Sequence, residues 1–426
     1  MSFGIALSGL DGAQSDLNVT ANNIANTATT GFKSSNSEFA ELFSASAQGV
    51  SDTQVGGGVQ LTQVQQQYSQ GNIENTGNSL DLALNGNGFF AVSDAGSIQY
   101  TRAGSFSPNS AGDVVNAQGH YLQVYSPTTT GSFNTTSLTN LKIPTGDSPP
   151  AASTTASMVF NLPASDSPPP DATFDPTDAN SYNQSTSITL YDSLGAAHTA
   201  SMYFINSGSG TWNAYETIDG NMVNPAVAPA TVPATYTPVT LAYSSSGALT
   251  SATDTAGNTN PQTLNFGSYT PTTGGAAMNV AFNLNDTTQY GNTFGVTGEN
   301  QNGYTTGQYN GVSVSGTGVV QANYTNGQSV ALGQVAVATF ANQQGLQQVD
   351  NTNWVQTFTS GPAIYGQAEG ANVGTIDPGS LEESNVDITK QLVNMITAQR
   401  AFQANAEMVS TENQITQTVI GIPQQA

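Results

Sequence analysis

The residue types that most often perform chemistry are few in this sequence and stand apart from one another. It has 2 histidines and no cysteine among 426 residues. His120 and His198 are each isolated, whereas a zinc site needs several closely spaced ligands. No G-x-S-x-G elbow and no P-loop occurs. We therefore expect each histidine to be a surface or satisfied polar residue, and we expect no catalytic residue, no cofactor, no metal site and no enzymatic activity.

Acidic residues are more numerous, but nothing marks a particular pair of them. The sequence has 28 Asp and Glu. The aspartates within residues 166–178 lack the glycine and the final glutamate of an EF-hand, so calcium is a weak alternative. A glycosidase needs a carboxylate pair, and Trp212 and Trp354 could stack on a sugar or pack in a core. An acidic glycosidase and a secreted β-rich adhesin or sugar-binding protein are the alternatives that the residues leave open.

The charge balance excludes two classes of partner. Only 5 basic residues stand against the acids, giving a net charge of -23. Lys33, Arg102, Lys142, Lys390 and Arg400 do not cluster, whereas phosphate and anionic lipid binding need clustered cations. No apolar run is long enough to span a bilayer, and the first residues lack the pattern of a cleaved signal. We expect no nucleic-acid partner, no membrane insertion and no cleaved leader.

Apolar residues at both ends of the chain recur in steps of three and four, which predicts helices. One interpretation is an ordinary helix packed on its own core. The other, favoured by the position of the stripes at the extreme ends, is a coiled coil in which the end helices pair with each other and then with further copies. The stripes run through Phe3, Leu7, Leu10, Leu17 and Ile24, and through Ile388, Leu392, Met395, Phe402, Ala406, Val409 and Ile420.

Between the ends, alternating apolar residues and turn signals predict strands. Residues 80–92 read as a hairpin around Asn85–Gly88, and residues 187–205 as a second hairpin around Asp192–Gly195. Proline-rich stretches at 145–150 and 167–170 mark a break in composition.

The predicted fold is mostly β and multidomain, with α-helical coiled-coil termini and a nested layout. Residues 1–25 and 385–426 would form an inner helical layer, and residues 26–70 and 371–384 would connect it to the β domains. Residues 71–145 and 330–370 would form a first β domain, with an outer β domain inserted at residues 146–329.

Several motifs in this sequence resemble those of the bacterial flagellar rod and hook protein family. The motifs cover both ends and the first β region: ALSGL at 6–10, NNIANT at 22–27, TGFKS at 30–34, SQGNI at 69–73, LALNGNGFF at 82–90, YTRAGSF at 100–106, GSLEESNVD at 379–387 and MITAQRAFQAN at 395–405. Within the family, LYDSLG at 190–195 and LGQVA at 332–336 resemble the hook members, with a distal rod or hook-associated protein as the alternative.

The resemblance implies a structural subunit of the flagellar hook. Such subunits assemble with themselves into a flexible curved tube that transmits motor torque to the filament. The implied partners are further copies, the distal rod protein, the hook cap protein, the hook–filament junction protein and the flagellar type III export apparatus. The implied location is extracellular, in the flagellum.

The resemblance also implies roles for particular residues. The paired end helices of the family line the tube, which assigns subunit assembly to Leu7, Leu10, Leu17, Ile24, Leu392, Met395, Phe402 and Val409. Phe39 and Phe43 resemble the Phe-x-x-x-hydrophobic element that the export gate reads; alternatively, they share one face of a short helix. The expected bend between tube lining and β domains consists of Asn22, Asn23, Asn26, Gly31 and Phe32.

Overall fold

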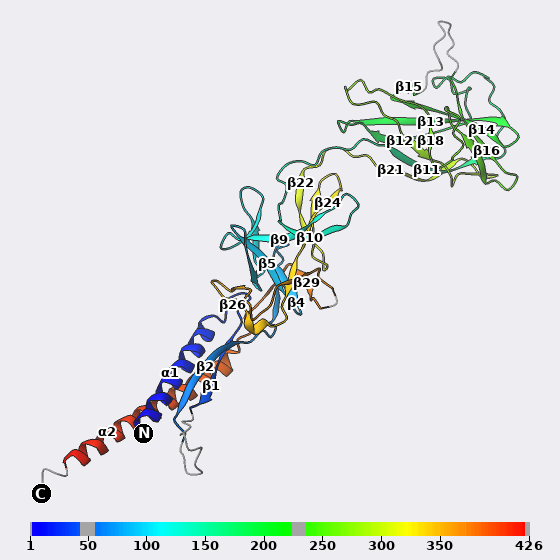
Figure 1. Ribbon diagram of the computed structural model, residues 1–426. Helices are drawn as coiled ribbons and strands as arrows, with labels where there is room; N and C mark the ends of the chain where they lie inside the picture. The colour runs from blue at the N-terminus through cyan, green and yellow to red at the C-terminus, as the bar shows by residue number, and fades with distance from the viewer. Residues whose placement is uncertain (1, 43–55, 224–235, 371, 422–426) are drawn as a thin grey trace. The chain divides into compact units, whose positions relative to one another are not determined.

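The computed structural model describes residues 2–42, 56–223, 236–370 and 372–421. In this part of the chain, α-helices form only at the two ends, as α1 (Ser2–Ala25) and α2 (Ile388–Gly421), and the segments between them form strands and loops (Figure 1). The prediction of a mostly β protein with one helix at each end is confirmed. Neither helix is long and apolar enough to cross a bilayer.

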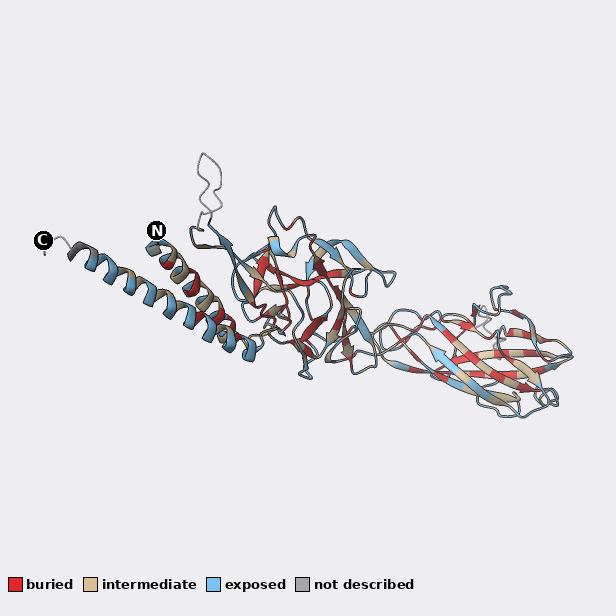
Figure 2. Cartoon of the chain, turned by 90° about the horizontal axis from the view of Figure 1, so that it is seen from below, coloured by how far each residue is buried: buried red, intermediate tan, exposed pale blue. Residues whose placement is uncertain are grey.

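The chain divides into two compact units. The first unit contains residues 1–145, 310–323 and 329–426, and the second contains residues 146–309 and 324–328. In each unit, buried residues alternate with exposed ones along many strands, as the colouring in Figure 2 shows. This alternation is what a strand with one face on a core requires, because successive side chains point to opposite faces.

The first unit is built around a 13-stranded sheet. Its central path is β22 (Tyr309–Val314), β23 (Val319–Tyr324), β24 (Ser329–Val335), β9 (Tyr121–Pro127), β5 (Phe89–Asp94), β6 (Ser97–Thr101), β27 (Asn353–Val355) and β26 (Gln347–Gln348). Off this path lie β7 (Phe106–Pro108), β8 (Val114–Asn116), β10 (Phe133–Asn140), β25 (Val337–Thr339) and β28 (Ile364–Gly366). A 3-10 turn, η1 (Gln343–Gly345), precedes β26. Trp354 is fully buried in this unit beside Phe89 and Tyr68.

Three two-stranded sheets complete the first unit. They are β1 (Ser35–Glu41) with β2 (Val59–Gln66), β3 (Ile73–Asn75) with β30 (Ser380–Glu382), and β4 (Leu82–Asn85) with β29 (Thr375–Pro378). The last two pairings join segments from opposite ends of the sequence. They tie the chain leaving α1 to the chain entering α2.

The hairpin predicted around Asn85–Gly88 is wrong. Both strands form and Gly86 and Gly88 do have positive φ, but β4 pairs with β29 and β5 pairs with β6, β9 and β25. The glycines turn the chain from one sheet into another. The hairpin predicted around Asp192–Gly195 is correct, because β12 and β13 pair over eight residues from Gln184–Phe204 to Tyr191–Ala197.

The second unit consists of two sheets packed face to face. One contains β18 (Leu264–Asn265), β19 (Ala281–Asn283), β11 (Thr155–Pro163), β20 (Thr288–Tyr290) and β21 (Gly295–Gln301). The other contains β12 (Gln184–Tyr191), β13 (Ala197–Gly208), β14 (Thr211–Ile218), β15 (Asn221–Met222), β16 (Val239–Tyr243) and β17 (Leu249–Thr253). Their shared core includes Phe160 and Phe204, whose ring centroids are 4.5 Å apart, and fully buried Trp212.

Candidate assembly surface of the terminal helices

The two terminal helices lie side by side and run in opposite directions (Figures 1 and 2). A Cβ added at Gly9 would lie 2.8 Å from Oδ1 of Asn405, so these two positions face each other. About two turns further along α1, Asp16 and Thr397 line the same cavity. As residue numbers rise along α1, the facing residues of α2 have falling numbers, so the two helices pack antiparallel.

Small and polar side chains occupy the buried positions of this pair. Ala6, Ala13 and Thr20 recur every seven residues on α1 and are buried. On α2, Gln391 is buried and Ala398 is 3% exposed. Short side chains let two helices approach closely, but they bury little apolar area. The contact between α1 and α2 within one chain therefore leaves many of the larger apolar side chains of both helices exposed to solvent.

The eight residues expected to mediate subunit assembly fall into two groups, six that are half-buried and two that are exposed. Leu10, Leu17, Ile24, Met395, Phe402 and Val409 are half-buried. Leu7 is 45% exposed and Leu392 is 42% exposed. The expected α1 stripe, which placed Phe3 and Leu7 in one seam with Leu10 and Leu17, is thus divided in the structure. The positions at steps of seven from Ala6 are more deeply buried than those at steps of seven from Phe3.

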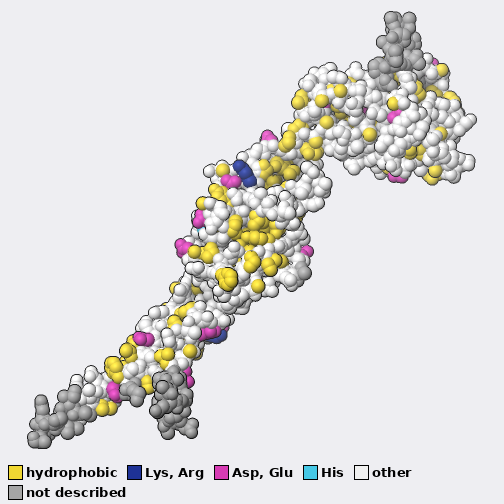
Figure 3. All heavy atoms as spheres, viewed as in Figure 1, with side chains coloured by type: hydrophobic (Ala, Val, Ile, Leu, Met, Phe, Trp, Pro, Cys, Tyr) yellow, Lys and Arg dark blue, Asp and Glu magenta, His cyan; other side chains and the backbone are white. Residues whose placement is uncertain are grey.

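Large apolar side chains remain on the surface of both helices. On α2, five of them are about half exposed: Ile388, Val393, Ile396, Met408 and Ile415. Figure 3 shows hydrophobic side chains on the surface of this helical end of the chain. Isolated exposed apolar residues are ordinary, whereas rows of them on two adjacent helices mark an interaction surface.

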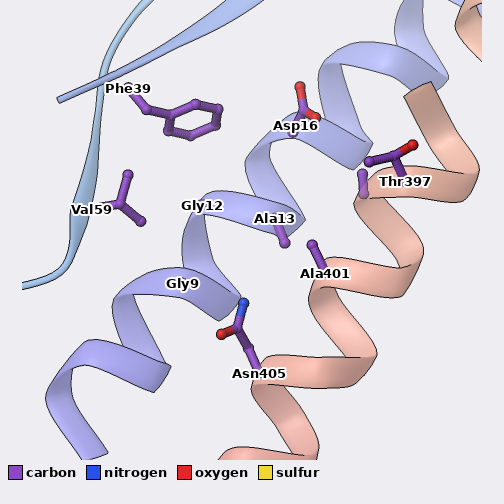
Figure 4. A pocket seen from close by; sticks show the side chains of 10 residues that line it. Gly9, Gly12, Ala13, Asp16, Phe39, Val59, Thr397, Ala401 and Asn405 are labelled. Carbon is purple, nitrogen blue, oxygen red and sulfur yellow. The ribbon is translucent and has the colours of Figure 1, made fainter. Parts of the chain in front are cut away.

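The hairpin of β1 and β2 covers one side of α1 and, with both helices, forms the walls of an open cavity. The cavity has a volume of about 290 Å³. Figure 4 shows Gly9, Gly12 and Ala13 of α1 facing it, with Ala401 and Asn405 of α2 on one side and Phe39 and Val59 of the hairpin on the other. A Cβ at Gly12 would lie 3.3 Å from Cγ1 of Val59. The glycines therefore make room for the hairpin and leave the cavity open.

Of the two phenylalanines of the proposed export element, only Phe39 lies within the described residues. Phe39 lies on β1, is 40% exposed and faces Gly12. Phe43 lies outside the described residues. Because residues 35–41 form a strand, the alternative of a short helix through Phe39 is wrong.

The expected bend begins at the C-terminal end of α1. Asn22 and Asn23 belong to its last turn, and Asn26 follows it, with its Nδ2 donating to Oδ1 of Asn22 at 2.7 Å. The buried Asn23 side chain forms a reciprocal pair with Ser35, donating to its carbonyl at 2.7 Å and accepting from its N–H at 2.9 Å. Paired amides of this kind fix the angle at which the chain leaves the helix.

Gly31 and Phe32 anchor the same segment to the β body. Gly31 has φ +69°, and a Cβ there would overlap the backbone of Ala103. Its N–H donates to the carbonyl of Glu382 at 2.8 Å. Phe32 is buried.

A buried ionic cluster next to this anchor was not predicted. Glu382 accepts from Lys33 Nζ at 2.7 Å and from Arg102 Nη1 at 3.2 Å, and all three side chains are almost fully buried. Burial lowers the pKa of both cations, although the carboxylate opposes that shift. Three segments distant in sequence therefore meet at one carboxylate. The sequence contains one signal of it, because Lys33 and Arg102 both lie within the family motifs although the chain has only 5 basic residues.

Asn385 adds a polar contact between the two connecting segments. Its Oδ1 accepts from the N–H of Ser34 at 2.7 Å, and its Nδ2 donates to the carbonyls of Gln67 and Ser69 at 2.7 Å and 3.0 Å. These bonds satisfy backbone groups that neither a helix nor a sheet pairs.

The histidines have polar partners, as expected. His120 lies 3.8 Å from a carboxylate oxygen of Asp94. His198 is buried between Asp219, at 2.6 Å from Nδ1, and Asp192, at 3.3 Å from Nε2. Burial opposes the charged ring, but the hydrogen bonds from Asp219 and Asp192 outweigh it and raise the pKa of His198. Among the described residues, no group of three acidic or histidine side chains is arranged to hold a metal ion.

Four protein-family models match consecutive parts of the chain. They are the flagella basal body rod protein at residues 3–33, the flagellar hook protein FlgE/F/G D1 domain at 83–158, the flagellar basal body protein FlaE D2 domain at 161–304 and the flagellar basal body rod FlgEFG protein C-terminal region at 377–422. These matches span α1, strands of both units and α2.

Curated relatives match over the whole length. The flagellar hook protein FlgE of Escherichia coli K12 is 37% identical over 99% of this chain and 100% of its own. The protein of the same name from Salmonella typhimurium is 38% identical over the same shares, and that of Treponema pallidum is 31% identical over 98% of each.

A solved structure shares the fold. The crystal structure of Helicobacter pylori flagellar hook protein FlgE2 matches 72% of this chain and 100% of its own, with a TM-score of 0.52 at 15% identity. The full-length identity to curated hook proteins, together with family models that cover both helices and both β units, shows that this chain belongs to the flagellar hook protein FlgE family, the structural subunits of the hook.

Proposed function

We propose that α1 and α2 act in the hook as a coiled-coil inner layer through which copies of this chain assemble. The observation that carries the proposal is the division of apolar residues on the helices. The contact within one chain buries Ala6, Ala13 and Ala398, while Leu7 and Ile396 stay 45% and 48% exposed. Burial of one such leucine or isoleucine contributes roughly 1.5–3 kcal/mol, so contact with further copies is the favourable outcome.

The proposed arrangement of the subunit is nested. Residues 1–25 and 385–426 form the inner layer, and residues 26–70 and 371–384 connect it to a first β domain of residues 71–145 and 330–370. Residues 146–329 form the outer β domain. The pairing of β3 with β30 and of β4 with β29 supports this layout, because it holds the two connecting segments together.

The proposed partners are those that the resemblance to the rod and hook family implies. As a hook subunit outside the cell, this chain meets the distal rod protein at one end of the tube, and the hook cap and hook–filament junction proteins at the other. Export by the flagellar type III apparatus uses Phe39 and Phe43 as the element that its gate reads. The 40% exposure of Phe39 on a two-stranded hairpin is compatible with that use.

A charge on the exposed stripe tests the assembly role. We expect Leu7→Asp to abolish tube formation by concentrated protein in electron micrographs, because a carboxylate would have to be buried at the contact. Leu7→Met, which keeps an apolar side chain at the same exposed position, is the matched control and should form tubes. The melting temperature of both variants should equal that of the parent, since the site is exposed. Normal curved tubes from Leu7→Asp would refute the assembly role of Leu7. Straight tubes from the parent protein would favour a rod-like polymer.

A further inference from the structure

The cavity between α1, α2 and the β1–β2 hairpin is open and lined by small side chains. Its volume of about 290 Å³ is several times the roughly 30 Å³ that one water occupies in the liquid. Gly9, Gly12, Ala13, Ala398 and Ala401 line it, with the ring of Phe39 at one side and polar groups from Asp16, Thr397 and Asn405 in its wall. A mainly apolar hollow of this kind on a subunit that polymerises is suited to receive a branched apolar side chain.

The last part of α2 carries such a side chain beyond the end of α1. Gly9 faces Asn405, so Ser2, seven residues before Gly9, lies opposite Glu412, seven residues after Asn405. No described residue of α1 lies opposite the stretch that follows Glu412, and Figures 1 and 2 show α2 extending past the start of α1. Ile415 lies on this stretch, is 53% exposed and is one heptad beyond the exposed Met408.

We propose that Ile415 of one copy of this chain inserts into the cavity formed by Gly9, Gly12, Phe39 and Ala401 of the next copy. The inference rests on the proposed assembly role of the helices and names the contact through which they act. The occupant is a second copy because hook subunits assemble with themselves and because the cavity is continuous with the α1–α2 pair.

The geometry of this contact selects an open polymer. The inserting side chain and the cavity lie at different places on the same chain, so each copy can offer one and receive the other. Contacts between two different surfaces repeat head to tail and generate a ring or a helical filament, whereas self-complementary contacts close as a dimer. A tube that elongates by adding subunits at its end needs head-to-tail contacts between two different surfaces.

Cysteine cross-linking tests the contact without background thiols, because the chain has no cysteine. In the Ala401→Cys, Ile415→Cys double variant, oxidation of assembled tubes should give a ladder of covalent multimers. The two positions are fourteen residues apart on one helix, about 21 Å, so a disulfide within one chain is impossible. Each single variant should stay monomeric on a denaturing gel.

The matched control pair is Gln403→Cys, Ile415→Cys. Gln403 is exposed and lies on another side of α2 from Ala401, so this pair should not cross-link. A ladder of equal strength in the control, or from Ile415→Cys alone, would overturn the proposal. Tubes that form normally and give no ladder from the first pair would also overturn it, while leaving the assembly role of the helices intact.

Assembly measurements give a second readout if the cysteine variants do not form tubes. We expect Ile415→Ala to raise the critical concentration for polymerisation about tenfold, and Ile415→Leu to change it less than twofold. Ala401→Phe should fill the cavity and block tube formation, whereas Gln403→Phe should not. Equal critical concentrations for the parent and Ile415→Ala would contradict the inserted side chain even though tubes form. Failure of the parent itself to polymerise would instead count against the proposed function.

Discussion

Each unit buries one glutamate, and the two carboxyl groups have different surroundings: Glu382 has charged partners, whereas one oxygen of Glu216 has no hydrogen-bond partner among the described residues. Glu382 receives two cations, and its burial is offset by their charges and by a hydrogen bond from the N–H of Gly71 at 2.9 Å. Glu216 on β14 is buried, and its Oε1 has no hydrogen-bond partner among the described residues. The sequence predicted neither role. An acidic residue inside a strand or connector carries no local signal of its partner, since that partner lies far away in the sequence.

Removing the charge of Glu382 should destabilise the first unit strongly. Glu382→Gln keeps the shape of the side chain but leaves Lys33 and Arg102 as two buried cations without a carboxylate, which typically costs about 3–5 kcal/mol. Thermal unfolding followed by circular dichroism should show a lower melting temperature for the first unit. Glu383→Gln, at an exposed neighbouring position, is the control. An unchanged melting temperature in Glu382→Gln would show that the cluster contributes no net stability.

The buried Glu216 should make the second unit less stable as pH rises. Burial raises the pKa of Glu216 from 4.5 to about 8. Between these values the folded state holds a proton that the unfolded state has lost, so stability falls with pH by up to about 1.4 kcal/mol per unit and is level outside that window. His198, with its raised pKa, acts in the same direction, and therefore the difference between variant and parent isolates Glu216.

Replacing Glu216 by glutamine should reduce that pH dependence. The Glu216→Gln variant and the parent should unfold at similar temperatures near pH 5, and the variant should be the more stable at pH 8. The exposed Glu299→Gln on β21 serves as the control. Parallel stability curves for Glu216→Gln and the parent from pH 5 to 8 would contradict a neutral buried carboxyl.

At the scale of elements, the type of each segment was easier to predict than its partner. Periodicity placed the terminal helices and many strands, because side-chain spacing follows directly from helix and strand geometry. The hairpin around Asp192–Gly195 was correct because its two strands are neighbours in sequence. The hairpin around Asn85–Gly88 failed because β4 pairs with β29, almost three hundred residues later. Local turn chemistry cannot reveal such a distant strand.

The helix stripes show the same limit. Steps of three and four predicted helices, but two heptad rows on α1 compete for the contact with α2. Leucine and phenylalanine favoured the row through Phe3 and Leu10, whereas the structure buries the row through Ala6 and Ala13. Close approach of α1 to the β1–β2 hairpin and to α2 favours small side chains there. The larger residues Phe3 and Leu7 stay about half exposed in the single chain.

At the scale of the whole molecule, the low content of charged residues leaves a surface that is polar but weakly charged. Only 8% of residues are charged, against roughly 25% in typical soluble domains. The outward positions of the edge strand β12 illustrate the result, with exposed Ser185, Ser187 and Thr189. Contacts through such hydroxyls are small and hydrated, and they can exchange partners at low cost. We propose that this surface lets the outer parts of the hook slide while the helical layer holds.

Apolar substitutions on β12 should therefore stiffen the polymer. In the triple variant Ser185→Leu, Ser187→Leu, Thr189→Leu, each leucine would add apolar area that favours one fixed contact over exchange. We expect electron micrographs of assembled tubes to show a narrower distribution of curvature than in the parent. The triple variant with asparagine at the same positions changes side-chain size but keeps polarity, and its curvature should match the parent. If the leucine tubes bend as freely as the parent tubes, the polar surface of β12 does not control flexibility, and the compliance must lie in the connecting segments around Asn23 and Glu382.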